Sequence, residues 1–224
     1  GGIGSHLVEP LARYLNDVLT HQELLLVDGD SYTRTDVDCQ RAREADAGLN
    51  KAEIQARHLR ALFTSPPVYA RGEFVSPRNA GEVLRDGDTV FLCVDNHATR
   101  KLVSDRCRKL RDILLISAGT YHADGNIQVF WRAKGEEKTA PLDQHHPEIR
   151  DPRDQNPAHL YREDVVRRPT DEQVLFANLT AAALALNAFY FATQSDTIYD
   201  EVFFSILANK VNPVSHRRRP SRRR

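Results

Sequence analysis

Hydrophobic residues along this chain follow two alternating patterns. After Gly4-Ser5, apolar side chains recur every three or four residues as far as Val18, which predicts a helix. The short apolar run 24–27 ends in Asp28-Gly29-Asp30, which is typical of a buried parallel strand with polar groups at its carboxyl end. The alternation continues, with helices expected at about 50–63, 98–110 and 170–192 and strands at 74–75, 89–94, 113–116 and 203–207. This order predicts an α/β fold with a Rossmann-like, doubly wound and mostly parallel sheet.

Three stretches in the second half depart from that rhythm. Residues 127–131 alternate between apolar and polar, which predicts an antiparallel extension of the sheet. Residues 134–169 are polar and rich in Pro, Asp and His, and we expect a long loop. The helix at 170–192 opens with Thr170 and Gln173 at capping-box spacing and is apolar around nearly its whole circumference. We expect this apolar C-terminal helix to be buried either in the core or in a homodimer interface.

The composition excludes several classes of protein. The 224 residues include 31 Lys or Arg and 31 Asp or Glu, and 41% are hydrophobic, which is an ordinary globular balance. We find no apolar run approaching the roughly 20 residues that span a bilayer and no signal peptide, so we expect no membrane partner. Three cysteines are too few and too scattered for a disulfide framework or a four-thiolate zinc site, and a cytoplasmic location is the simplest interpretation.

The neutral net charge averages two unlike parts. The tail 217–224 carries six arginines, and the rest of the chain has 25 cations against 31 anions. The body is therefore mildly acidic, and we expect no specific nucleic-acid partner. Because the chain contains no methionine and opens inside what resembles a glycine motif, we expect an N-terminally truncated fragment that lacks a first strand.

The glycine-rich start suggests an anion site. Gly2 and Gly4 precede a helix, whose free N–H groups and positive dipole end suit a phosphate, although such starts also serve packing. Asp28 ends the next strand about 24 residues later, where dinucleotide-binding folds place an acid on the ribose hydroxyls. The other interpretation of Asp28 is the cap of a turn.

Two more residues fit phosphate chemistry. Asp95 ends the strand 89–94, and a carboxylate there can hold magnesium against phosphates. The alternative is a cap, since Asn96 and Thr99 are capping types too. Lys51 opens a helix, where a cation opposes the dipole, so it suits a facing phosphate or else remains a solvated surface lysine.

Taken together, these motifs resemble the ThiF/MoeB/ubiquitin-activating superfamily over roughly residues 1–135. The later apolar helix and the loop around His146 to Asp154 resemble bacterial ThiF-type proteins more weakly. The stretches that carry the resemblance are Gly-Gly-Ile-Gly-Ser at 1–5, Val27-Asp28-Gly29-Asp30, Gln40-Arg41, Asn50-Lys51-Ala52, and Cys93-Val94-Asp95-Asn96 with Arg100.

Members of this superfamily bind ATP and magnesium, adenylate a C-terminal carboxylate and generally work as dimers. The resemblance implies a ThiF-type nucleotide-binding domain at 1–209. We expect the remainder, 210–224, to be a disordered Arg-rich tail, because residues 217–224 include no apolar side chain to bury. The resemblance implies an acceptor that is a small ubiquitin-like or sulfur-carrier protein or peptide ending in Gly. It makes Asp95 and Arg41 catalytic, with Asp95 as the magnesium ligand. It implies nucleotide contacts from Gly2, Gly4, Asp28, Asp30, Thr35, Asp36, Gln40, Arg41, Lys51 and Asn96. Pyrophosphate leaves with growing negative charge, so such a site needs cations, a metal and oriented N–H groups rather than a nucleophile.

The chain also departs from the family pattern. The family loop usually reads Asn-x-x-Arg-Gln, but here Asp36 stands at the asparagine and Cys39 at the arginine. Arg41 is the candidate to replace the lost cation. The paired CxxC motifs of zinc-binding relatives are absent, so no zinc is expected. No cysteine follows Trp131, so no thioester step is expected.

Two alternatives to the adenylyltransferase stay open. One is a catalytically degenerate ThiF-like scaffold, which the changes at 36 and 39 favour. The other is a dinucleotide-binding Rossmann enzyme, which has no need of a magnesium carboxylate together with a lysine.

Two smaller motifs have competing interpretations. The pair His145-His146 forms either part of a metal site or a loop turn, and we favour the turn because no third ligand is recognisable. Tyr121, His122 and Asp124 either contact a substrate or form a hairpin, and we favour the hairpin.

Overall fold

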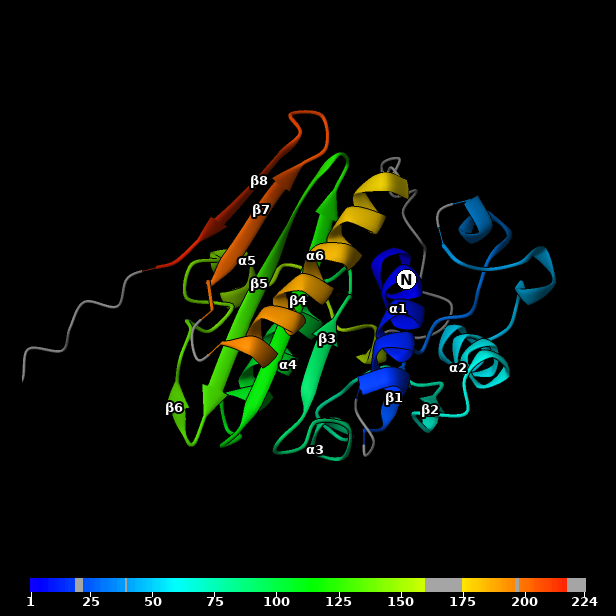
Figure 1. Cartoon of the computed structure of the whole chain (residues 1–224), viewed down its shortest axis with the longest axis horizontal. Helices are drawn as coiled ribbons and strands as arrows, with labels where there is room; N and C mark the ends of the chain where they lie inside the picture. The colour runs from blue at the N-terminus through cyan, green and yellow to red at the C-terminus, as the bar shows by residue number, and fades with distance from the viewer. Residues whose placement is uncertain (19–21, 39, 160–174, 196–197, 217–224) are drawn as a thin grey trace, which may run out of the picture.

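The computed structural model describes residues 1–18, 22–38, 40–159, 175–195 and 198–216. Its elements form three layers, with α1 and α6 on one face of a central sheet and α4 on the other (Figure 1). The longer helices are α1 (Gly2–Val18), α2 (Lys51–Leu62), α4 (His97–Cys107) and α6 (Leu175–Gln194), and the short ones are α3 (Ala80–Val83) and α5 (Pro147–Arg150). The strands are β1 (Leu24–Val27), β2 (Val68–Arg71), β3 (Thr89–Leu92), β4 (Ile113–Tyr121), β5 (Asp124–Ala133), β6 (Glu136–Glu137), β7 (Glu201–Ser205) and β8 (Lys210–Val214).

The strands form two sheets. β1 and β2 pair in parallel in a two-stranded sheet, and a six-stranded sheet has the order β3-β4-β5-β7-β8, with β6 paired to β5. β3 and β4 are parallel, while the pairs β4–β5, β5–β7 and β7–β8 are antiparallel. The α/β class and its antiparallel extension are therefore confirmed. The extension is larger than the pattern at 127–131 indicated, because two C-terminal strands join it.

Side-chain alternation along β4 divides the core between the two faces. Leu114, Ile116 and Ala118 pack with α1 and α6, whereas Ile113 and Leu115 pack with α3, α4 and α5. Successive strand residues point to opposite faces, and both faces of this strand are covered by helices. That is why its sequence is a continuous apolar run instead of an alternating one.

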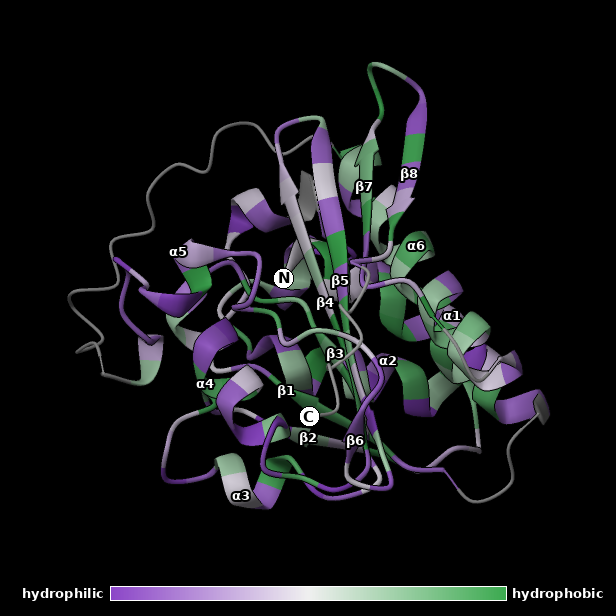
Figure 2. Cartoon of the chain, turned by 90° about the vertical axis from the view of Figure 1, so that its left-hand side faces the viewer, coloured by the Kyte–Doolittle hydropathy of each residue, from purple (hydrophilic) through white to green (hydrophobic). Residues whose placement is uncertain are grey.

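Helix α6 is apolar over almost its whole surface, and Figure 2 shows it nearly all green while α1 is mixed. Its 20 residues include no Asp, Glu, Lys or Arg, and by length and composition alone the helix could cross a membrane. The expectation that no segment reaches this limit was therefore wrong. One face nevertheless packs on the sheet and α1, through Ala177, Asn178, Ala181, Ala182, Ala185, Ala188 and Phe189.

Two expected boundaries were wrong. The strand expected at 74–75 lies instead at Val68–Arg71, and Phe74 packs its ring against Gly29. Residue 210 does not start a disordered tail, because Lys210–Val214 forms β8 against β7. Residues 217–224, Cys39 and the Thr170/Gln173 pair lie outside the described residues.

The expected missing first strand would lie between β1 and β3. Among the described strands, β1 pairs only with β2 and β3 pairs only with β4, so the two sheets are not joined there. Whether a strand occupies that space in the whole protein stays a prediction.

Candidate functional site

The glycine turn lies at the carboxyl ends of β1 and β3, which Asp28 and Asp95 follow in sequence. The Gly1 nitrogen lies 3.4 Å from Asp28 Oδ2. A Cβ placed on Gly1 would lie 3.7 Å from the carbonyl oxygen of Cys93, two residues before Asp95. The turn therefore reaches the ends of both strands, which is the arrangement that a nucleotide site in an open α/β sheet requires.

The start of α1 suits an anion. Helix α1 begins at Gly2, and its first turn contains no acidic residue. The N–H groups of a first helical turn have no partner within the helix, and the dipole makes that end positive. The backbone N–H of Arg41 donates to Ser5 Oγ at 3.1 Å, so this loop is fixed against the same turn.

Asn50 holds the loop that follows β1. Its Oδ1 accepts from the Glu53 backbone N–H and caps α2, while its Nδ2 donates to the carbonyl oxygens of Asp28 and Asp30. Asp28 Oδ1 in turn accepts from the Asp30 backbone N–H at 2.9 Å. In the sequence Asn50 is recognisable only as part of a motif, because a helix cap has a local pattern whereas a contact with a distant strand end has none.

Lys51 lies inside this region, with 6% of its side chain exposed. Its Nζ is 3.7 Å from Asp36 Oδ2, 3.9 Å from Asp30 Oδ2, and 5.7 Å from the centre of the Tyr32 ring. The Tyr32 hydroxyl accepts from Gln55 Nε2 at 2.7 Å, and burial raises the pKa of Tyr32 to about 12. Lys51 is thus a buried cation held by two carboxylates rather than a solvated surface lysine.

Asp36 is buried in a short 3₁₀ turn, Arg34–Asp38, and organises the loop around it. It accepts hydrogen bonds from the Thr33 backbone N–H at 2.7 Å, the Thr33 hydroxyl at 2.8 Å and Gln40 Nε2 at 2.6 Å. Gln40 Oε1 is buried without a hydrogen-bond partner among the described residues. Thr35 is exposed, with its hydroxyl 3.0 Å from that of Thr33.

The guanidinium of Arg41 pairs with Glu9 of α1, and 52% of the Arg41 side chain is exposed. The Arg41 carbonyl oxygen accepts from Gln55 Nε2 at 2.7 Å. Its backbone is therefore fixed, while its charged group makes only a partly exposed ion pair of the kind that contributes little stability. That Arg41 replaces the arginine of the family loop stays a prediction.

Asp95 is exposed at the end of the third strand, next to the start of α4. Asn96 caps this helix, since its Oδ1 accepts from the Thr99 backbone N–H at 2.8 Å, so the capping interpretation holds for Asn96. Asp154 also caps it, accepting from the backbone N–H groups of His97 and Ala98 at 2.7 and 2.8 Å. With the helix end capped by two other residues, the Asp95 carboxylate can act as a hard oxygen ligand of the kind that Mg²⁺ prefers.

Arg100 of α4 joins the ends of the two parallel strands β3 and β4. Its buried guanidinium donates to the carbonyl oxygens of Val94 and Ala118 at 2.5 and 2.8 Å and to Ser117 Oγ at 2.5 Å. These bonds fix the backbone at Val94 against β4 and thereby the position of the adjacent Asp95.

Two smaller motifs have structural roles. His146 contacts Glu201 at 2.5 Å and Glu148 at 2.9 Å, within a long loop that packs on β7. The β4–β5 hairpin turns at His122, which has a positive φ of 50°, so the hairpin interpretation is confirmed.

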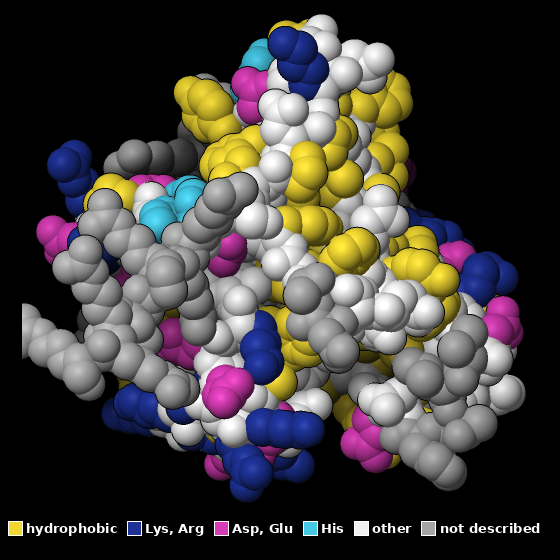
Figure 3. All heavy atoms as spheres, turned by 60° about the vertical axis from the view of Figure 1, so that its left-hand side comes forward, with side chains coloured by type: hydrophobic (Ala, Val, Ile, Leu, Met, Phe, Trp, Pro, Cys, Tyr) yellow, Lys and Arg dark blue, Asp and Glu magenta, His cyan; other side chains and the backbone are white. Residues whose placement is uncertain are grey.

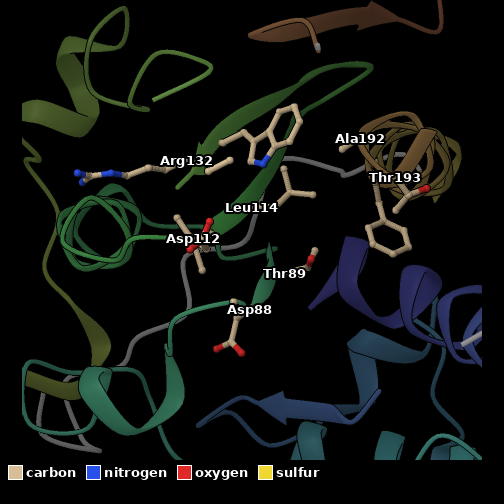
Figure 4. Close-up of a pocket in the computed structure, with 12 residues that line it drawn as sticks. Asp88, Thr89, Asp112, Leu114, Arg132, Ala192 and Thr193 are labelled. Carbon is tan, nitrogen blue, oxygen red and sulfur yellow. The ribbon is translucent and has the colours of Figure 1, made fainter. Parts of the chain in front are cut away.

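A cavity of about 230 Å³ lies elsewhere, at the amino ends of β3 and β4. Figure 4 shows that the Arg132 side chain points away from the other labelled residues, including Asp112 and Thr193. Arg132 instead donates from Nε to the Gly135 carbonyl oxygen at 3.1 Å. The polar groups that line this cavity do not converge on one point. The candidate site therefore remains at the carboxyl ends of β1 and β3.

Known proteins resemble this chain in sequence and in fold. The model of the ThiF family matches residues 1–215. The chain belongs to the ThiF family. Its solved structural neighbours include E. coli MccB with AMPCPP and MccA (TM-score 0.73, 20% identity, 99% of this chain and 63% of that one). Another is PaaA (TM-score 0.70, 16% identity, 96% of this chain and 61% of that one). At these identities the likeness shows the fold.

Curated relatives match this ThiF-family chain over part of its length. One is the adenylyltransferase and sulfurtransferase MOCS3 of Drosophila ananassae, 32% identical over 136 residues, which are 60% of this chain and 29% of the relative. Another is the adenylyltransferase and sulfurtransferase uba4 of Emericella nidulans, 32% identical over 105 residues, which are 46% of this chain and 22% of the relative. The matched segments thus span less than a third of these relatives.

Proposed function

We propose that this ThiF-family chain is the nucleotide-binding part of an ATP-dependent adenylyltransferase. Its substrate would be the C-terminal carboxylate of a small ubiquitin-like or sulfur-carrier protein or peptide. The observation that supports this most is the position of the glycine turn, which contacts Asp28 after β1 and approaches Cys93, two residues before Asp95, after β3. The names of the relatives MOCS3 and uba4 support the same reaction class.

In this proposal, different residues of the site bind different parts of ATP. The first-turn N–H groups of α1 bind phosphate, and Asp28 accepts from the ribose hydroxyls. Lys51 adds a positive charge, and Asp95 would hold Mg²⁺ when the metal is bound. When bound, the metal stabilises the negative charge that develops on departing pyrophosphate. The acceptor carboxylate is itself the nucleophile, so the site needs no nucleophilic side chain.

We further propose that no thioester step follows adenylation. Burial raises the pKa of Cys93 to about 11 and that of Cys107 to about 12. Thiols with such pKa values are almost wholly protonated at neutral pH and are poor nucleophiles. Both described cysteines are free, which fits the cytoplasmic location that we also propose.

The exposed face of α6 supports a homodimer. Phe176 is 65% exposed and Tyr190 54%, with Leu179 and Phe191 on the same side of the helix. Val211 of β8 extends this surface, because it pairs with Phe204, which packs beneath α6. Figure 3 shows hydrophobic side chains gathered over the upper half of one face, below the tip of the β7–β8 hairpin. A contiguous apolar surface of this kind is typical of an interface.

The test is ATP–pyrophosphate exchange by the full-length protein. Peptides and small proteins ending in Gly-Gly are offered as acceptors, with the same peptides amidated at the C-terminus as the control. Labelled pyrophosphate should enter ATP only with a free carboxylate. Absence of exchange with every acceptor would contradict the proposal.

A non-catalytic scaffold is the second candidate. The Arg41–Glu9 ion pair and the two carboxylates beside Lys51 favour it, because both reduce the positive charge available to ATP. A scaffold would show no exchange although the chain folds. The dinucleotide-binding enzyme is disfavoured by the family match.

A further inference from the structure

The buried face of α6 carries one side-chain amide among alanines and a phenylalanine. Asn178 is 0% exposed, whereas the other buried residues of this helix are Ala or Phe189. Burying an amide is unfavourable unless it is hydrogen-bonded. The Thr120 hydroxyl donates to Asn178 Oδ1 at 3.1 Å, and Thr120 lies near the carboxyl end of β4.

The other side of the amide lies against Gly2. A Cβ placed on Gly2 would fall 2.4 Å from Asn178 Nδ2 and 2.9 Å from its Cγ, which is closer than real atoms approach. A Cβ on Gly4 would instead meet its nearest neighbour, Cys93 Cβ, at an ordinary 3.6 Å. A side chain at position 2 would therefore displace Asn178, whatever the ligand.

This contact lies at the start of α1. Gly2 is the first residue of that helix, so Asn178 touches the turn whose N–H groups point towards the candidate site. We infer that Asn178 is a positioning residue, which holds the first turn of α1 in register with the end of β4. The identity of the ligand rests on the proposed function, but the contact itself does not.

Two roles of Asn178 can be distinguished by experiment: a clamp, which holds the first turn of α1 in place, and a spacer, which only fills the volume between α1 and α6. If Asn178 only fills space, removing it leaves the turn in place and creates a small cavity. If it clamps the turn, removing it lets the phosphate-binding N–H groups move. ATP binding then weakens, while the chemistry of the bound complex changes less.

The experiment uses the full-length protein and three substitutions. Asn178→Ala removes the amide, and Thr120→Val removes only the hydroxyl that donates to it while keeping the side-chain shape. Asn187→Ala, an exposed amide on the same helix, is the matched control. We expect Asn178→Ala to raise the KM for ATP in pyrophosphate exchange about tenfold with kcat changed less than about threefold. Thr120→Val should shift KM in the same direction by a smaller factor, and Asn187→Ala should leave it unchanged.

A double substitution separates clamp from spacer. Gly2→Ala should lower the melting temperature because its methyl group meets Asn178, and Gly2→Ala with Asn178→Ala should recover it. The double variant should nevertheless keep the raised KM. The inference would be overturned if the double variant recovered both the melting temperature and the KM for ATP of the parent. It would also be overturned if Asn178→Ala and Thr120→Val left the KM unchanged.

Hydrogen–deuterium exchange without nucleotide provides a readout that is independent of activity. Asn178→Ala, or Thr120→Val if the former does not fold, should speed exchange at residues 1–8 and 118–122 and leave the rest of the sheet unchanged. Uniform or unchanged exchange would overturn the clamp. If this local change occurs but the parent shows no pyrophosphate exchange, the clamp stands and the proposed function fails.

Discussion

At the scale of single residues, the main departure from the family pattern is the carboxylate of Asp36. It is buried, accepts from Thr33 and Gln40, and lies 3.7 Å from Lys51. Lys51 is consequently shared between two carboxylates before any nucleotide is present. The negative charge at position 36 should therefore oppose the binding of ATP.

Asp36→Asn removes that charge. We expect it to tighten ATP binding about three- to tenfold, because Lys51 loses a competing anion, and to lower stability by about 1 kcal/mol through the weakened bond with Gln40. Calorimetric titration with Mg-ATP measures the first effect and urea unfolding the second. Asp105→Asn, on an exposed part of α4, is the control. Unchanged or weaker ATP binding by Asp36→Asn would show that Lys51 does not face the nucleotide.

Arg41 can be tested against a neighbour that shares its partner. Arg41 and Arg13 both pair with Glu9, but only Arg41 lies in the loop next to the site. If Arg41 replaces the family's arginine, Arg41→Ala should lower pyrophosphate exchange about 100-fold, since a cation that stabilises the leaving group is lost. Arg13→Ala should have little effect. Full exchange in Arg41→Ala would remove Arg41 from the catalytic residues.

At the scale of elements, the two faces of α6 predict how the molecule associates. A charge on the exposed apolar face cannot be buried without a large unfavourable desolvation free energy. Leu179→Lys should therefore convert a dimer into a monomer in analytical ultracentrifugation while leaving the fold intact. Leu62→Lys, an exposed leucine on α2, is the control and should leave the dimer unchanged. A parent protein that is monomeric at micromolar concentration would contradict the proposal that the exposed face of α6 forms a dimer interface.

Sequence patterns predicted the elements whose apolar residues repeat. Helices α1, α2 and α4 and strands β1, β3 and β4 follow such repeats, but β8 does not, because its sequence Lys-Val-Asn-Pro-Val has no continuous apolar run. Strand-end placement likewise indicated Asp28 and Asp95. The contacts of Asn50 and Asn178 depend on which distant segments meet in space, and no local pattern encodes them.

At the scale of the whole molecule, His146 and Glu201 join the long loop before α6 to the C-terminal strands. The bond to Glu201, together with one to Glu148, raises the pKa of His146 although burial opposes it. Burial raises the pKa of Glu201, but bonds from His146, His216 and Asn126 outweigh it and lower that pKa below its usual value. His216 also stacks on His145, with ring centres 3.7 Å apart.

These shifts predict a pH window for stability. The raised pKa of His146 contributes stability that is complete below about pH 6.5 and is lost as the pH rises through the folded-state value. The lowered pKa of Glu201 contributes stability that is present above about pH 4.3 and is lost as the pH falls. The ion pair is therefore strongest between these limits.

His146→Gln tests this window. Relative to the parent, it should lower the melting temperature by about 2–4 °C at pH 6 and by less at pH 9, as expected for loss of about 1 kcal/mol. His58→Gln, on α2, is the control. An equal effect of His146→Gln at both pH values would contradict an ionic contribution.

The most direct test of the central claim compares turnover with ATP binding in Asp95→Ala. A carboxylate that holds magnesium acts mainly on the charge that develops as pyrophosphate leaves, so its loss should depress turnover more than affinity. We predict that Asp95→Ala lowers kcat for pyrophosphate exchange about 100-fold or more while the Kd for ATP changes less than about fivefold. Asp105→Ala should match the parent in both. Retention of full exchange by Asp95→Ala would contradict an adenylating site at the carboxyl ends of β1 and β3.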